Sequence, residues 1–210
     1  MGMLLTFLLW TAAVCTIDVR PIGPQGSAVG FGAVNRYFHS LTGVHPLLYI
    51  VTDWLSLVPL GFALGFALLG LVQWIRRKRL GKVDYSIRVL GGFYILVMAV
   101  YILFEWLAVN HRPVLINGVL EASYPSSTTM LVMCIMPTSV LQLQERIGNR
   151  RLKRWLCAGI TGFAIFMVTG RLLSGVHWLT DIIGGILLST GLVCMYDAVC
   201  HLKIRLDEIE

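Results

Sequence analysis

The sequence predicts an all-α fold, a bundle of six transmembrane helices that forms a single domain over residues 1–210. Hydrophobic residues make up 57% of the chain and charged residues 13%, whereas soluble domains average ~45–50% and ~25%. The mean hydropathy is +0.77. The apolar residues also gather in runs near the ~20 residues that a membrane-spanning helix needs. This composition excludes an ordinary soluble domain, a disordered chain and a collagen-like chain, and the length leaves no room for a second domain.

The first predicted span covers residues 3–19. It lacks the basic residues that open a signal peptide and the Ala-x-Ala site that ends one. We therefore expect this segment to remain in the protein as a membrane span.

Five further apolar runs predict the remaining spans, and a run of four basic residues after position 75 ends the first of these five. They cover residues 55–75, 87–107, 127–144, 155–169 and 178–200. The runs at 127–144 and 155–169 are short, so we expect them to lie untilted or in a thin region of the bilayer.

The segment between the first two spans differs in composition. Residues 18–46 are rich in Gly and Pro and predict an irregular loop, with a short interfacial helix at 31–40. Residues 45–54 are amphipathic and are expected to lie at the membrane interface. The five cysteines show no C-x-x-C pair or zinc spacing, so we interpret them as packing residues.

The formal charge of +6 would suggest a nucleic-acid partner in a soluble protein, but in a membrane protein it bears on orientation. Of the 17 Lys and Arg residues, 13 lie in residues 76–88, 146–154 and the C-terminal tail (Lys203 and Arg205). With six spans these regions share one side, which the positive-inside rule makes cytoplasmic. Both termini are then cytoplasmic, and residues 18–54, 108–126 and 170–177 face outward.

Ionisable residues cluster at the predicted outward ends of the spans, and such groups at membrane depth are a functional hypothesis by default. They are Glu105, His111, Arg112, Arg171, His177 and Asp181. His177 and Asp181 are four residues apart and share a helix face, so the carboxylate can hold one imidazole nitrogen and leave the other free to react. The alternative for such a pair is a packing or capping role.

Two further pieces belong to the same outer face. Residues 125–129 read Pro-Ser-Ser-Thr-Thr and open the fourth span, either as an ordinary helix start or as an anion-binding helix terminus. His111-Arg112-Pro113 follows the third span. Two arginines, a helix N-terminus and a His/Asp pair together predict a phosphate-ester site. No acidic cluster accompanies them, so we expect neither a metal nor another cofactor.

These residues resemble the three motifs of the type 2 phosphatidic acid phosphatase (PAP2) superfamily, K-x6-R-P, P-S-G-H and S-R-x5-H-x3-D. Arg112-Pro113 matches the end of the first motif, and Pro125-Ser126 the start of the second. Arg171, His177 and Asp181 match the third motif with its full spacing. The resemblance covers residues 105–181 and agrees with six spans and an active site at the outer membrane–water interface.

The resemblance implies a role for each matching residue. His177 would attack phosphorus and form a phosphohistidine, while Asp181 would hold its tautomer. Arg112 and Arg171 would bind the phosphoryl oxygens, helped by Ser126 and by the backbone at Ser127.

Three positions depart from the motifs. Glu105 replaces the Lys of the first, Gly170 the Ser of the third, and Thr128 the His of the second that would protonate the leaving group. A Thr hydroxyl is a poor general acid. Either the substrate is a polyprenyl diphosphate, whose leaving group needs less protonation, or His111 acts as the acid; His111 can equally be a surface histidine. We expect Glu105 to pair with Arg112 or to point away.

The sequence therefore predicts a metal-independent membrane phosphatase that hydrolyses a lipid phosphate or diphosphate, such as undecaprenyl diphosphate, phosphatidylglycerol phosphate or phosphatidic acid. Its partner is a membrane lipid, with no nucleic acid and no obligate protein partner. The alternative is a catalytically impaired relative that binds or moves anionic lipids. A transporter is disfavoured because the spans lack mid-membrane polar residues and inverted repeats.

Overall fold

The computed structural model describes residues 2–207, and these residues are almost entirely helical. The α-helices are α1 (Gly2–Thr16), α2 (Gly32–Thr42), α3 (Pro46–Leu55), α4 (Leu57–Arg77), α5 (Tyr85–Leu107), α6 (Ser127–Arg146), α7 (Arg150–Leu173) and α8 (Leu179–Asp207). Within this part of the chain, β-structure is limited to isolated bridges. The predicted all-α fold is confirmed.

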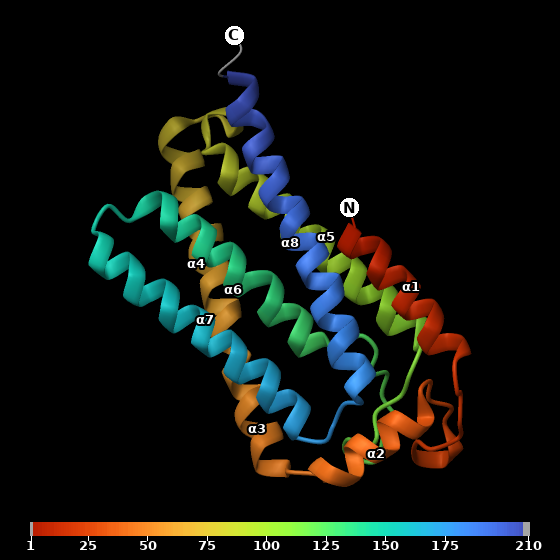
Figure 1. Cartoon of the computed structure of the whole chain (residues 1–210). Helices are drawn as coiled ribbons and strands as arrows, with labels where there is room; N and C mark the ends of the chain where they lie inside the picture. The colour runs from red at the N-terminus through yellow and green to blue at the C-terminus, as the bar shows by residue number, and fades with distance from the viewer. Residues whose placement is uncertain (1, 208–210) are drawn as a thin grey trace.

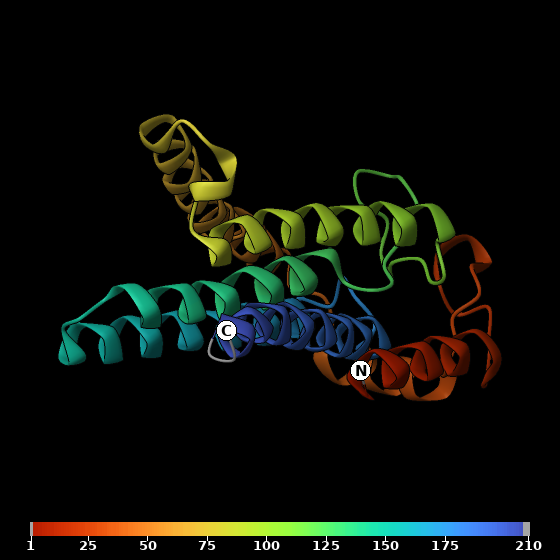
Figure 2. The ribbon, with the colours of Figure 1, turned by 90° about the horizontal axis from the view of Figure 1, so that it is seen from above.

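Helix α6 is the centre of the bundle, and α4, α5, α7 and α8 all pack against it (Figures 1 and 2). Its sequence is less apolar than those of α4, α5 and α8, and most of its residues are buried or partly buried. The hydroxyls of Thr138 and Ser139 donate to backbone carbonyls of the same helix at 2.8 and 2.7 Å. Such internal pairing satisfies polar groups that are fully buried.

Four helical segments are long and apolar enough to cross a membrane, counted over the described residues. They are Pro46–Arg77, Tyr85–Leu107, Arg150–Leu173 and Leu179–Leu202. The predicted first span forms α1, which has only 15 residues and at ~1.5 Å per residue is shorter than the ~30 Å hydrocarbon core. Four of the six predicted spans are therefore confirmed, and the crossing of the membrane by α1 and α6 stays a prediction.

The expectation of a short fifth span is wrong. The predicted range 155–169 lies inside α7, which has 24 residues. The helix begins earlier because the Asn149 side chain accepts hydrogen bonds from the backbone N–H groups of Arg151 and Leu152, at 3.0 and 3.1 Å. Such an N-cap stabilises a first turn made of basic residues, which hydropathy alone assigns to the loop.

The two ends of the bundle differ. The connections α4–α5 and α6–α7 lie near the C-terminal end of α8, at the upper end of Figure 1. The side chains of Lys203 and Arg205 lie outside the described residues. The opposite end carries α2, which confirms the short helix predicted at 31–40, together with α3 and the α5–α6 and α7–α8 connections.

Helix α1 holds the segment that leads into α6. The ring of Phe7 on α1 packs on Phe104 and Tyr124, with centroids 5.5 and 6.3 Å apart. The hydroxyls of Thr11 and Tyr124 also share a hydrogen bond of 2.7 Å. These contacts fix the residues directly before Ser126, where α6 begins.

Candidate active site

The α7–α8 turn brings His177 and Asp181 into the interior of the bundle. Gly175 makes this turn possible because its φ is +71° and an added Cβ would lie 1.9 Å from the carbonyl oxygen of Gly43. The backbone N–H of His45 donates to the carbonyl of Ser174 at 2.9 Å. The turn is thus packed against the α2–α3 segment, and only glycine fits at its tightest point.

His177 contacts a carboxylate with one ring nitrogen and a guanidinium with the other, and its side chain is almost completely buried. Nδ1 lies 3.8 Å from Oδ2 of Asp181, and Nε2 lies 3.3 Å from Nη1 of Arg112. A guanidinium can only donate hydrogen bonds. Nε2 is therefore the acceptor, and the proton of the neutral ring is on Nδ1, which faces the carboxylate.

Asp181 is fully buried and is held by donors on both of its oxygens. Oδ1 accepts from the Asn110 side chain at 3.0 Å, and Oδ2 from the backbone N–H of Trp178 at 3.0 Å. Behind it, the Asn35 amide donates to the hydroxyl of Thr180 at 2.9 Å. This network fixes the carboxylate that faces His177, and the sequence analysis identified neither Asn110 nor Asn35.

The charge state of His177 follows from this environment. Its pKa is lowered to about 4, chiefly by burial and also by the positive charges of Arg112 and Arg171, while Asp181 opposes these effects. At neutral pH the imidazole is uncharged, and the lone pair on Nε2 is available.

Arg112 is buried and is held by the α5–α6 loop. Its backbone N–H donates to the carbonyl of Glu121 at 3.0 Å. Its Nε also lies 3.0 Å from Oε2 of Glu121, as an ion pair without hydrogen-bond alignment. Glu105 is exposed and has no ion pair among the described residues, so of the two expectations for Glu105 the structure supports the one in which it points away from Arg112.

Arg171 is about 1% exposed, and α3 supplies its surroundings. Nη1 donates to the hydroxyl of Thr52 at 3.4 Å and lies 3.7 Å from Oδ1 of Asp53. The guanidinium also stands 4.8 Å from the centroid of the Tyr49 ring, a cation–π contact. No sequence pattern links these three residues to Arg171, because they lie more than 100 positions away from it.

The N-terminus of α6 contributes backbone more than side chains. Ser126 is buried; its hydroxyl caps the helix by accepting from the N–H of Thr129 at 3.5 Å, and its own N–H donates to the carbonyl of Asp181 at 3.1 Å. Ser127 is partly exposed. Thr128 lines a cavity of about 180 Å³ between α4, α5 and α6, together with mainly apolar residues.

The side chains of two predicted site residues, Thr128 and His111, make no described contact with His177 or Asp181. Thr128 makes no contact with His177 or with either arginine among the interactions of the described residues. His111 takes part through its backbone carbonyl, which accepts from Nε1 of Trp178 at 2.7 Å. The structure thus brings together Arg112, His177 and Asp181, with Arg171 and Ser126 on neighbouring segments.

Comparison with known proteins identifies the family. A model of the PAP2 superfamily matches residues 93–201, which is just over half of the chain. The fold also matches the crystal structure of a transmembrane PAP2 type phosphatidylglycerolphosphate phosphatase from Bacillus subtilis, with a TM-score of 0.64, 20% identity and 94% of each chain covered. No curated protein sequence matches. The apolar helices and this transmembrane neighbour identify an integral membrane protein, and the family model shows that the chain belongs to the PAP2 superfamily.

Proposed function

We propose that this protein is a membrane lipid phosphatase that works through a phosphohistidine at His177. One observation carries the proposal: in a buried site, Arg112 lies 3.3 Å from Nε2 of His177 while Asp181 faces Nδ1. The uncharged ring offers its lone pair on the same side as a phosphate-binding guanidinium. Membership of the PAP2 superfamily supports phosphatase chemistry at the family level.

The proposed reaction has two steps. The lone pair on Nε2 of His177 forms a bond to phosphorus, and the bond from phosphorus to the lipid-side oxygen breaks with its electron pair on that oxygen. Asp181 stabilises the cationic ring through the Nδ1 proton. Water then forms a bond to phosphorus while the bond from phosphorus to Nε2 breaks with its electron pair on Nε2. The protons of the water leave with the inorganic phosphate, and the ring is neutral again.

Arg112 and Arg171 would bind the phosphoryl oxygens, because planar guanidinium groups match phosphate geometry and stay charged. Arg112 would leave Nε2 and move onto an oxygen when the substrate arrives. The N-terminus of α6, with Ser126 and Ser127, would add backbone N–H groups and a positive helix end.

The substrate class depends on the leaving group. Thr128 stands where the family has a histidine, and it lines a separate cavity. Without an acid, a leaving group that departs as a phosphate is favoured over one that departs as an alkoxide. A polyprenyl diphosphate therefore suits this site better than a lipid monophosphate, unless His111 supplies the proton. The Bacillus subtilis relative is named as a phosphatidylglycerolphosphate phosphatase. Turnover of phosphatidylglycerol phosphate by this protein would test whether His111 supplies the proton.

We also propose that the site faces outward. The basic α4–α5 and α6–α7 connections lie at the opposite end of the bundle from the α7–α8 connection (Figure 1), which contains His177. The positive-inside rule puts that basic end, and both termini, in the cytoplasm.

Phosphate release from a panel of undecaprenyl diphosphate, phosphatidylglycerol phosphate and phosphatidic acid tests the proposal. His177→Ala should abolish release, whereas His45→Ala should retain it, because the His45 side chain is exposed and contacts only the carbonyl of Thr42. Activity that survives His177→Ala would contradict the phosphohistidine mechanism. Strong inhibition by EDTA would contradict the metal-independent one.

The general acid is tested separately. If His111 protonates the leaving group, His111→Ala should lose activity on monophosphates and keep more of it on diphosphates. Thr128→Ala should change neither, because its hydroxyl is a poor acid. An unimpaired His111→Ala enzyme rules out His111 as the acid.

Two observations favour the alternative, a catalytically impaired relative that binds or moves anionic lipids. The acid position holds Thr128, and His177 is only 3% exposed. Lipid binding without turnover of any substrate in the panel is the result that would support this alternative.

A further inference from the structure

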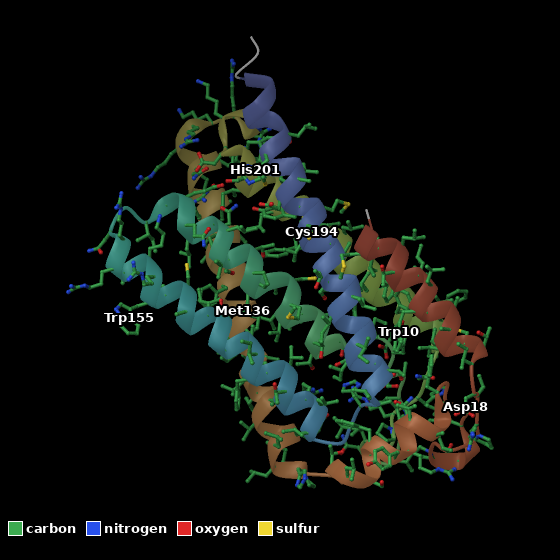
Figure 3. The ribbon with its side chains drawn as sticks, in the orientation of Figure 1. Trp10, Asp18, Met136, Trp155, Cys194 and His201 are labelled. Carbon is green, nitrogen blue, oxygen red and sulfur yellow. The ribbon has the colours of Figure 1, made fainter. Side chains whose placement is uncertain are left out.

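A long groove runs between α7 and α8, and none of the predicted site residues lines it. The two helices meet at the α7–α8 turn and diverge from there, and α6 forms the floor between them (Figures 1 and 2). The groove has a volume of about 620 Å³, within the ~300–1,000 Å³ of typical ligand sites. Figure 3 labels Met136 on α6 and Cys194 on α8, which both line it.

The lining of this groove is mainly apolar, and α7 contributes one face of it beside residues of α6 and α8. That face carries Ile160, Thr161, Ala164, Ile165 and Val168, and it ends at Thr169. From Ile160 to Thr169 the helix rises ~14 Å, at ~1.5 Å per residue. This length is close to half of the ~30 Å hydrocarbon core, so the groove fits an acyl chain from a single leaflet.

A second hollow continues the groove toward the basic end of the bundle. Its volume is about 700 Å³, and it shares Leu141 and Asp197 with the groove. Arg150, Lys153 and Arg154, from the start of α7, line it. Figure 3 labels His201 on the α8 side of the same hollow.

Among the described residues, neither acid of this hollow forms an ion pair with Arg150, Lys153 or Arg154. Glu145 lies 3.6 Å from Arg146, and Asp197 lies 3.3 Å from His201, so each acid has a partner of its own. Lys153 donates to the carbonyl of Gln144 at 3.1 Å. Across the described residues, Arg150 and Arg154 have no ion pair. Three cations thus lie beside one end of an apolar groove whose length is close to that of one membrane leaflet.

We propose that this groove binds an anionic phospholipid of the surrounding membrane. One acyl chain lies along α7 over Met136, and the phosphate group lies among Arg150, Lys153 and Arg154. Basic pockets between membrane helices are suited to such headgroups. The charge selects an anionic lipid over a zwitterionic one, and the groove selects a lipid over a soluble phosphate.

This site is separate from the proposed reaction. Its cations, Arg150, Lys153 and Arg154, belong to the start of α7, whereas His177 belongs to the α7–α8 connection at the other end of that helix (Figure 1). Lipid binding here is therefore measurable in a protein without any phosphatase activity.

Native mass spectrometry of the delipidated full chain in detergent tests the proposal by titration with dioleoyl phosphatidylglycerol or dioleoyl phosphatidylcholine. The headgroup variant is Arg150→Gln, Lys153→Gln and Arg154→Gln together. Its control carries the same charge change at Arg76, Lys78 and Arg79, which are exposed and lie outside the groove. Removing three such cations should weaken phosphatidylglycerol binding by about 100-fold, at a factor of roughly 5 for each.

The acyl-chain part is tested with Thr161→Trp, which fills the groove, against Ala158→Trp, on an exposed part of α7 outside it. Thr161→Trp should weaken binding of both lipids, and Ala158→Trp should not. Equal binding of the two lipids to the unchanged protein, no phosphatidylglycerol binding at all, equal losses in the two triple variants, or full binding by Thr161→Trp would each overturn the proposal.

Discussion

Asp181→Asn keeps the shape of a fully buried side chain and removes its charge. In the structure, Oδ1 of Asp181 accepts from Asn110 and Oδ2 accepts from the N–H of Trp178, each at 3.0 Å. Oδ2 also faces Nδ1 of His177 at 3.8 Å. An amide has one acceptor oxygen and one donor group where the carboxylate has two acceptors. The variant can therefore accept a hydrogen bond at only one of the two positions at which the carboxylate oxygens accept.

The expected loss of activity in Asp181→Asn follows from the tautomer of His177. If the new amide presents its NH2 group to Nδ1, the ring proton moves to Nε2, where Arg112 already donates at 3.3 Å. Nε2 then has no lone pair for phosphorus, and kcat should fall on the order of 10³–10⁴-fold, as for the equivalent change in other His/Asp pairs. If the oxygen faces Nδ1, the NH2 groups of Asn110 and the new residue oppose each other, at a cost of about 1–3 kcal/mol in stability.

Initial rates of phosphate release across lipid concentrations test this reasoning. KM should change little, because in the proposed mechanism Arg112 and Arg171 bind the phosphate, and the loss should appear in kcat. Thr180→Val is the matched control: it alters the same buried network, where Asn35 donates to Thr180 at 2.9 Å, and leaves the charge at position 181 intact. A kcat for folded Asp181→Asn within about tenfold of the parent would refute the assigned tautomer role.

Three further predictions concern the same region. Gly175→Ala should destabilise the protein by more than about 2 kcal/mol, since φ is +71° and the new Cβ would meet a backbone oxygen at 1.9 Å; Gly118→Ala, with φ +78° and open space, should cost less in thermal unfolding, and equal costs would contradict the clash. Glu121→Gln should lower KM by roughly 2–5-fold at unchanged kcat, because a carboxylate 3.0 Å from Arg112 competes with the phosphate in a partly exposed pair; a raised KM would instead mean that Glu121 positions the arginine. Because the pKa of folded His177 is about 4, against 6.5 for a free histidine, the unfolded chain binds the extra proton between these pH values, and stability should fall by about 3 kcal/mol from pH ~7 to ~4. The stability of His177→Gln should fall by about 3 kcal/mol less over the same pH range, as measured by unfolding in detergent. Identical pH profiles for the two proteins would contradict the lowered pKa of His177.

The sequence by itself determined the membrane class, most helix ranges and the core of the candidate site. Hydropathy is a local property, so the runs that form α4, α5, α6 and α8 are visible without a structure. The His177/Asp181 spacing is also local, because a four-residue separation on a helix fixes a shared face. The predicted pair is indeed buried together. Local hydropathy failed where a cap extended α7 into basic residues.

The tertiary structure alone decided which groups surround the arginines. Asp53 and Tyr49 reach Arg171 from a segment more than 100 positions away, and Glu121 occupies the place beside Arg112 that the motif position of Glu105 suggested. It also placed Thr128 in a cavity with residues of α5 and opened the groove between α7 and α8. Such contacts depend on how distant helices pack, and helix packing follows from side-chain shape across whole faces rather than from any local pattern.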